Sequence, residues 1–165
     1  GNRDFLISET FAKKHKISLI PDPTIININR KKILLMHGDT LCVDDKKYQE
    51  FRKLVRSSAW QSQMLEKPLS ERLQIATKLR NESQIEIDLK DEFIMDVNNE
   101  EVDNVFDRYD VDELIHGHTH RPNIHKIKMK DKYVRRIVLG DWYKSSYVLF
   151  YDSKGILIDR HHLSN

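Results

Sequence analysis

Histidines recur at alternating positions in one short stretch of the chain, His116-Gly117-His118-Thr119-His120. Gly117 permits a tight backbone turn there, because a residue without a Cβ has a wide choice of conformations. Neutral imidazole is a ligand that suits Zn, Mn and Fe. The pattern therefore predicts a metal site, with a chance cluster in a chain of eight histidines as the alternative.

Two further segments bring ligand-type side chains. Met36-His37-Gly38-Asp39 directly follows a short apolar run, and Gly1-Asn2-Arg3-Asp4 opens the sequence. Each segment alone is also compatible with an ordinary turn, in which Asp39 caps or turns the chain. The candidate metal ligands are Asn2, His37, His118 and His120.

These candidates follow predicted strands. The apolar run before His37 indicates a buried strand that ends in a loop, and Leu114-Ile115 precedes the histidine cluster. The region from 111 to the end is rich in strand patterns, such as the alternation over 126–130. Loops at strand ends are where catalytic groups usually lie.

The middle of the chain has a helical pattern instead. Tyr48, Phe51, Leu54 and Val55 share one helical face, and Pro68 stops that region and opens a further helix. A polar stretch from Arg80 to Asp91 follows. The sequence thus predicts an α/β or α+β core formed by residues 1–45 and 110–165, with residues 46–109 inserted as a helical lid.

Composition narrows the class of protein. A chain of 165 residues with 39% hydrophobic and 33% charged residues fits one soluble globular domain. The formal net charge of +2 does not call for a nucleic-acid partner. The single cysteine, Cys42, cannot form an internal disulfide, and no apolar run approaches the length that spans a bilayer.

The order of the three motifs, Gly-Asn-x-Asp, His-Gly-Asp and Gly-His-Thr-His, resembles that of the calcineurin-like metallophosphoesterases. The resemblance implies a sandwich of two sheets flanked by helices, with two divalent ions in a loop cluster. Two earlier motifs of that family, Asp-x-His and Gly-Asp, are missing here together with the first strands. We therefore expect a chain cut from a longer protein; a processed N-terminus is the alternative.

Within that family, the sequence is similar to the branch that hydrolyses UDP-2,3-diacylglucosamine in lipid A synthesis. The similarity covers nearly the whole chain. At Arg3 most family members carry histidine, whereas this branch has arginine. Arginine keeps its proton and can clamp a diphosphate bidentately, although a surface salt bridge is the alternative. The segments that carry the similarity include Gly1–Ile7, Leu19–Thr24, His37–Cys42, Leu114–Pro122 and Val138–Tyr143.

The resemblance implies hydrolysis to UMP and 2,3-diacylglucosamine 1-phosphate (lipid X), with a metal-activated water attacking the α-phosphorus. Two divalent ions, expected to be Mn²⁺, would be held by Asn2, His37 and His118 at one site and by His120 at the other. Arg3 and His118 are the implied catalytic residues. The implied substrate contacts are Asn2, Arg3, Asp45, Tyr48, Arg80, Ser83, Lys90 and His118. Ordinary alternatives exist, with Asp45 as a helix cap, Tyr48 in the core and Lys90 as a solvated charge.

The same resemblance implies a lipid-linked UDP-sugar as partner, no nucleic acid and no protein partner. It implies a cytoplasmic location at the inner face of the bacterial inner membrane. A basic cluster could attract that anionic surface, while edge-strand lysines that block aggregation are the alternative. The cluster consists of Lys126, Lys128, Lys130, Lys132, Arg135 and Arg136.

Two competing functions stay open at this point. The chain could be another calcineurin-like phosphoesterase, such as a nucleotide or protein phosphatase. It could also be an inactive metal-binding fragment or scaffold, and we expect this stretch alone to bind metal weakly and to catalyse little.

Overall fold

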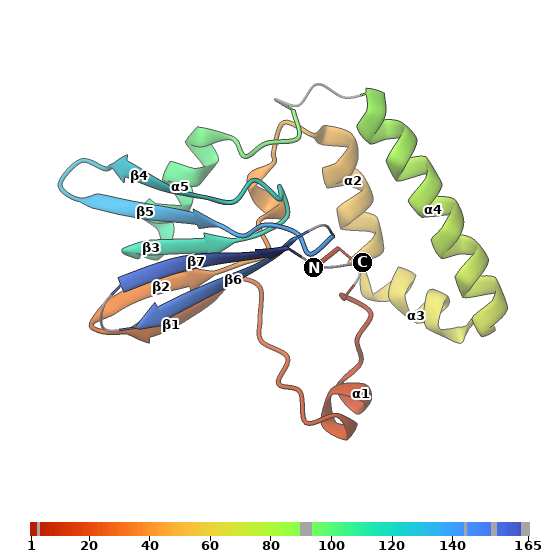
Figure 1. Ribbon diagram of the computed structural model, residues 1–165. Coiled ribbons are helices and arrows are strands. Elements are labelled where there is room, and N and C mark those ends of the chain that lie inside the picture. Colours follow the sequence, from red (N-terminus) through yellow and green to blue (C-terminus); the bar gives the residue numbers. More distant parts are fainter. Residues whose placement is uncertain (3, 90–93, 144, 153–154, 163–165) are drawn as a thin grey trace.

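The computed structural model describes residues 1–2, 4–89, 94–143, 145–152 and 155–162, with the side chains at 84 and 86–89 excepted (Figure 1). The helices are α1 (Glu9–Lys14), α2 (Lys46–Val55), α3 (Ser58–Glu66), α4 (Leu69–Leu89) and α5 (Asn99–Tyr109), with a 3-10 turn at Asp39–Leu41. The strands are β1 (Thr24–Ile28), β2 (Lys31–Leu35), β3 (Glu113–His116), β4 (Asn123–Lys128), β5 (Tyr133–Val138), β6 (Ser145–Asp152) and β7 (Gly155–His162).

Five strands form the main sheet, in the order β1-β2-β3-β5-β4. The central strands β2, β3 and β5 run parallel, and the edge strands β1 and β4 pair antiparallel. Parallel strands are buried on both faces and therefore carry continuous apolar runs, as Ile33-Leu34 and Leu114-Ile115 do here. Because β2 and β3 are parallel and Leu35 pairs with Ile115, the loops that follow these strands leave the sheet at the same end.

Each face of the main sheet is covered by a different layer. Helix α5 buries Val102, Val105 and Phe106 against one face. The two-stranded sheet β6–β7 packs on the other face, where Leu149 and Ile158 meet the apolar side chains of the central strands. The expected sandwich of two sheets flanked by helices is confirmed, and Figure 1 shows its layers.

Helices α2, α3 and α4 stand to one side of this sandwich (Figure 1). The carboxylate of Asp45 caps α2 by accepting from the Tyr48 amide at 3.1 Å, and Ser57 caps α3 in the same way. Helix α4 begins directly after Pro68, as predicted. The helix continues through most of the polar stretch noted from residue 80 and ends at Leu89. Polar residues can stabilise a helix through ion pairs between residues four positions apart, such as Lys78 and Glu82.

Helix α5 falls within the predicted insertion but packs on the sheet, so the boundaries of the lid stay a prediction. None of the helices in the described residues is both long and apolar enough to cross a membrane.

Candidate metal centre

The loops after β2 and β3 are joined by backbone hydrogen bonds. The Met36 amide donates to the Ile115 carbonyl at 3.1 Å, and the Gly117 amide donates to the His37 carbonyl at 3.0 Å. These bonds bring the rings of His37 and His118 to a centroid separation of 5.0 Å, edge to face. The parallel register of two strands thus places two candidate ligands together.

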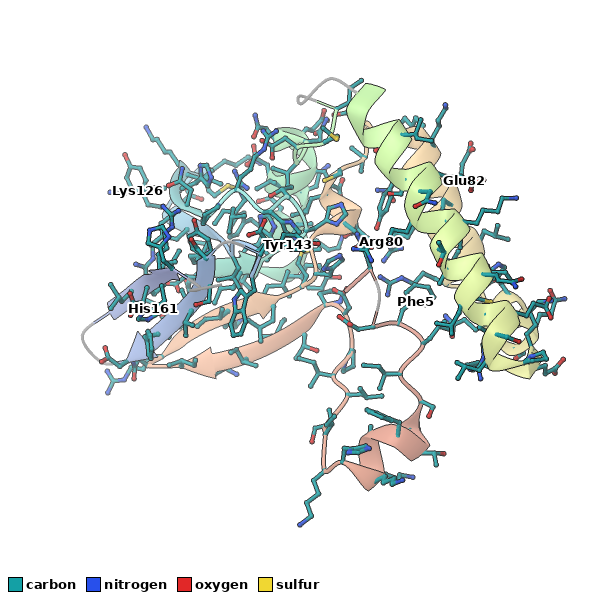
Figure 2. All side chains as sticks on the ribbon, turned by 45° about the vertical axis from the view of Figure 1, so that its right-hand side comes forward. Phe5, Arg80, Glu82, Lys126, Tyr143 and His161 are labelled. Atoms are coloured by element: carbon teal, nitrogen blue, oxygen red, sulfur yellow. The ribbon has the colours of Figure 1, made fainter. Side chains whose placement is uncertain are left out.

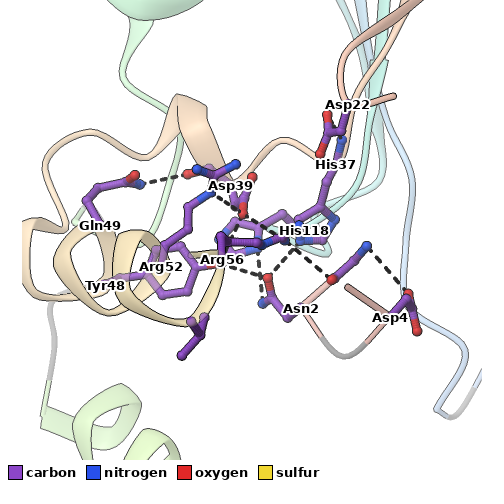
Figure 3. Close-up of polar contacts among 12 residues, drawn as sticks. Asn2, Asp4, Asp22, His37, Asp39, Tyr48, Gln49, Arg52, Arg56 and His118 are labelled. Carbon is purple, nitrogen blue, oxygen red and sulfur yellow. Dashed lines mark hydrogen bonds and ion pairs between the residues drawn. The ribbon is translucent and has the colours of Figure 1, made fainter. Parts of the chain in front are cut away.

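Asn2 completes this group from the beginning of the chain. Its Oδ1 lies 2.8 Å from His37 Nε2, and its Nδ2 lies 3.4 Å from His118 Nδ1. The Tyr48 hydroxyl donates to the same Oδ1 at 2.7 Å (Figure 3). Three of the four predicted ligands, Asn2, His37 and His118, therefore converge on one point, and helix α2 contacts them through Tyr48.

The His-Gly-Asp turn depends on its glycine. Gly38 has φ of 103°, in the left-handed region that favours glycine. A Cβ at this position would lie 2.7 Å from Nδ1 of His116, which is a clash. His116 itself is buried at the end of β3, where Nδ1 faces the Gly117 carbonyl at 2.9 Å and Nε2 faces Arg136 at 3.2 Å. The buried ring of His116 therefore packs against the His-Gly-Asp turn and supports it.

Asp39 is the central charged residue beside the group, and sequence reasoning treated it only as a turn residue. It is 1% exposed. Its Oδ2 accepts from Arg52 Nε at 2.7 Å and from Arg56 at 3.4 Å, while the Tyr48 hydroxyl donates to it at 3.3 Å. The spacing of Arg52 and Arg56, one turn apart on the helix that follows the motif, is the signal that could have identified this ion pair.

The environment sets the charge of these groups. Burial, together with the smaller effect of the neighbouring His37, lowers the pKa of His118 to about 4. Burial also lowers the pKa of His37, against the opposing charge of Asp39. Burial alone would raise the pKa of Asp39, but the hydrogen bond and charge of Arg52 hold it below the ordinary value. At neutral pH the two imidazoles are therefore neutral and able to act as metal ligands.

The donor set fits a divalent ion. Donors bound to one ion at about 2.1 Å lie about 3.0–3.4 Å apart in octahedral or tetrahedral geometry. Asn2 Oδ1 and His37 Nε2, both possible ligand atoms, lie 2.8 Å apart, which is close to that spacing, and His118 Nδ1 lies beside the same amide group. In the described part of the chain, no three His, Cys, Asp or Glu side chains gather closely enough to hold a metal, so this set depends on the Asn2 amide.

The other predicted site residues are placed differently. His120 is exposed, with Nδ1 3.8 Å from an Asp141 oxygen and its ring 6.4 Å from that of Tyr143. Arg80 and Ser83 are exposed on α4, and Figure 2 shows Arg80 and Glu82 on opposite sides of that helix. Arg3 and Lys90 lie outside the described residues. The ligand and substrate roles of all these residues stay predictions.

The profile of the calcineurin-like phosphoesterase family matches residues 1–122. The chain belongs to this family. It is 44% identical to a UDP-2,3-diacylglucosamine hydrolase of Xanthomonas oryzae pv. oryzae, with 97% of this chain and 68% of the relative covered. Hydrolases of the same name from Stenotrophomonas maltophilia and Pectobacterium carotovorum are 43% and 46% identical. These alignments cover 96% and 90% of this chain, and 67% and 62% of the respective relative.

Proposed function

We propose that this chain carries the activity named in its relatives, the metal-dependent hydrolysis of UDP-2,3-diacylglucosamine to UMP and lipid X. The observation that carries the proposal is the convergence of Asn2, His37 and His118 where the β2 and β3 loops meet. The 44% identity over 97% of the chain to a hydrolase of that name supports the choice of substrate.

In this proposal Asn2, His37 and His118 hold one divalent ion, and His120 belongs to the site of a second. Both ions are taken to be Mn²⁺. Such ions, when bound, polarise a phosphoryl oxygen and lower the pKa of a bound water. The residues of the chain itself hold the proposed ligands in position. Tyr48 fixes the Asn2 amide at 2.7 Å, and the Gly117–His37 backbone bond holds the two histidine loops together.

The exposed apolar side chains of helix α4 support the proposal of an amphiphilic substrate. Leu69, Leu73 and Ile85 expose 64%, 59% and 61% of their surface, so the helix leaves apolar area open to a partner. Leu73 and Ile85 line an open groove of about 550 Å³ that also contains Lys78. Apolar surface beside cationic and polar groups suits acyl chains and a diphosphate. We therefore retain Asp45, Tyr48, Arg80, Ser83 and Lys90 as proposed substrate contacts, with Arg3 on the diphosphate.

The direct test is UMP release from UDP-2,3-diacylglucosamine by the full gene product that contains this sequence, with and without Mn²⁺. We expect release only with the metal. Even outer-shell partners of metal ligands are worth about 10- to 100-fold in activity. Asn2→Ala and His118→Ala should therefore each lose at least about a hundredfold, whereas His161→Ala, at an exposed position of β7, should lose little.

Two results would contradict the proposal. Faster hydrolysis of a generic phosphomonoester than of the UDP-lipid would point to another phosphoesterase of the family. No release from a folded, metal-loaded protein would point to a metal-binding scaffold.

We also propose that the protein works at the cytoplasmic face of the bacterial inner membrane. Lys126, Lys128 and Lys130 are exposed along β4 and the loop after it, which supports attraction to an anionic surface. Two residues of the expected basic cluster do not belong to that surface. Arg135 contacts the buried Glu113, and Arg136 is 8% exposed.

Binding to vesicles that contain phosphatidylglycerol tests the membrane proposal. Each lysine near the surface contributes about 1 kcal/mol, so charge reversal at Lys126, Lys128 and Lys130 should weaken binding strongly at low salt. Salt should weaken the binding of the wild type, because screening reduces the attraction. Charge reversal at Lys53, exposed on α2, is the matched control. Vesicle binding that ignores both salt and the β4 lysines would rule this surface out.

A further inference from the structure

A polar cavity lies next to the histidine loop and has no role in the proposed function. Its volume is about 300 Å³, at the lower end of the range for small-molecule sites. Asn2, His37 and His118 are not among the described residues that line it. The polar part of its lining comes from the segment before α5, from the histidine loop and from β4 and β5: Asp96, Thr119, Arg121, Asn123, His125 and Arg136.

Arg136 supplies a buried cation to this lining. The residue is 8% exposed, and its Nη1 donates to Nε2 of His116 at 3.2 Å. Among the described residues, no carboxylate lies within ion-pair distance of its guanidinium. Burial lowers the pKa of Arg136, and the charge of Asp96 opposes that effect only in part. Arginine nevertheless keeps its proton, so a buried positive charge faces the cavity without a direct counterion.

The other charged residues of the lining do not neutralise the guanidinium of Arg136. Asp96 is already bound, because its Oδ2 accepts from Arg121 at 2.8 Å and its Oδ1 accepts from the Val97 amide at 2.7 Å. Burial lowers the pKa of His125, which favours the neutral ring. With two arginines against one aspartate, the lining carries a net charge of +1.

Thr119 adds a hydroxyl without a partner. Its Oγ1 is buried and makes no hydrogen bond to any residue that the structure describes. A buried polar group in this state costs free energy, unless a ligand or water completes its bonding. An unpaired donor and an uncompensated guanidinium on one small cavity are together complementary to an anion that accepts hydrogen bonds.

We propose that this cavity binds a small oxyanion of the phosphate class, either inorganic phosphate or the phosphate group of a monoester. The guanidinium of Arg136 offers the fork of donors that matches phosphate oxygens, and the Thr119 hydroxyl donates to a further oxygen. Asn123 and His125 line the same cavity from β4. Thr119 stands between His118 and His120 in the chain, so the anion contacts the loop that carries the predicted metal ligands.

The experiment is a titration of the isotopically labelled protein with inorganic phosphate, followed by backbone amide NMR shifts. It is run once with Mg²⁺ and once with EDTA, because phosphate also binds to metal ions. Saturable shifts of Asn123, His125 and Val138 are expected under both conditions. A parallel titration with phenyl phosphate distinguishes the two sources of the phosphate group by their relative affinity. The absence of saturable shifts, or shifts confined to Asn2 and His37, would overturn the proposal.

Two variants test the residues that carry the argument. Arg136→Gln should weaken phosphate binding about tenfold, as expected for loss of a charge-assisted hydrogen bond. Lys53→Gln removes an exposed charge from α2, outside the cavity, and should leave the affinity unchanged. Arg136 also contacts His116, so its replacement could prevent folding, and a second variant is needed.

Thr119→Val keeps the shape of the side chain and removes only the unpaired hydroxyl. Without phosphate it should be at least as stable as the wild type, because an unsatisfied buried group is lost. With phosphate it should bind about fivefold more weakly, and its thermal midpoint should rise less. Phosphate affinity that is unchanged in Thr119→Val would show that the cavity does not bind the anion in this way.

Discussion

The carboxylate of Asp39 connects the turn after β2 with helix α2. It is buried and contacts Arg52, Arg56 and Tyr48, and Tyr48 also holds Asn2. The electrostatic support of the candidate metal centre therefore depends on one residue that is not among the predicted ligands. Residue types alone suggest the candidate ligands, but an ion pair between a turn and a later helix depends on packing that residue types do not show.

Replacement of this carboxylate should cost stability. In Asp39→Asn the two arginines lose their anionic partner in a largely buried setting, and we expect a loss of about 3 kcal/mol. Urea unfolding at pH 7 measures the difference. Asp103→Asn, at an exposed position of α5, is the matched control and should change stability by less than about 0.5 kcal/mol. Equal stability of Asp39→Asn and the wild type would refute this role.

The same ion pair has a defined pH dependence. The folded-state pKa of Asp39 lies below its ordinary value of 3.8, so the unfolded chain takes up this proton first. Its contribution is therefore present above pH 3.8 and is lost as the pH falls through the lower folded value. The stability gap between wild type and Asp39→Asn should close in that acidic range. A gap that is constant from pH 7 to pH 3 would contradict the assignment.

At the scale of elements, the candidate metal centre results from strand register. The parallel pairing of β2 with β3 brings the His-Gly-Asp and Gly-His-Thr-His loops to one edge, as the two strand-end patterns indicated. Helix α4 was harder to predict, because hydrophobic periodicity fades after Leu79 although the backbone stays helical to Leu89. The pairing of β6–β7 over the main sheet is non-local, and no local pattern identifies which face it covers.

Gly38 tests how closely these two loops are packed. Gly38→Ala would place a Cβ 2.7 Å from His116 Nδ1, at a backbone conformation that alanine rarely adopts. We expect a loss of about 1–3 kcal/mol in stability and a displaced histidine loop. Urea unfolding measures the loss of stability, and a weaker affinity for Mn²⁺ reports the displaced histidine loop. Gly155→Ala is the matched control. Its φ is also positive, but no atom lies within 4 Å of the position that a Cβ would take. Similar losses in both variants would show that backbone strain, and not the contact with His116, is responsible.

At the scale of the whole molecule, metal binding and folding are linked. An ion that binds only the folded state adds about 2.7 kcal/mol of stability at a concentration 100 times its dissociation constant. Mn²⁺ should therefore raise the thermal midpoint of the wild type. Asn2→Ala should abolish most of that rise, while Asn104→Ala on α5 should not. A full rise in Asn2→Ala would place the bound metal elsewhere in the chain.

The contact between Asn2 and His118 joins residues 116 positions apart. Closing so long a loop costs conformational entropy, so this contact depends on the sheet that brings the loops after β2 and β3 together. A chain emerging from the ribosome cannot complete the centre until residue 118 has been made.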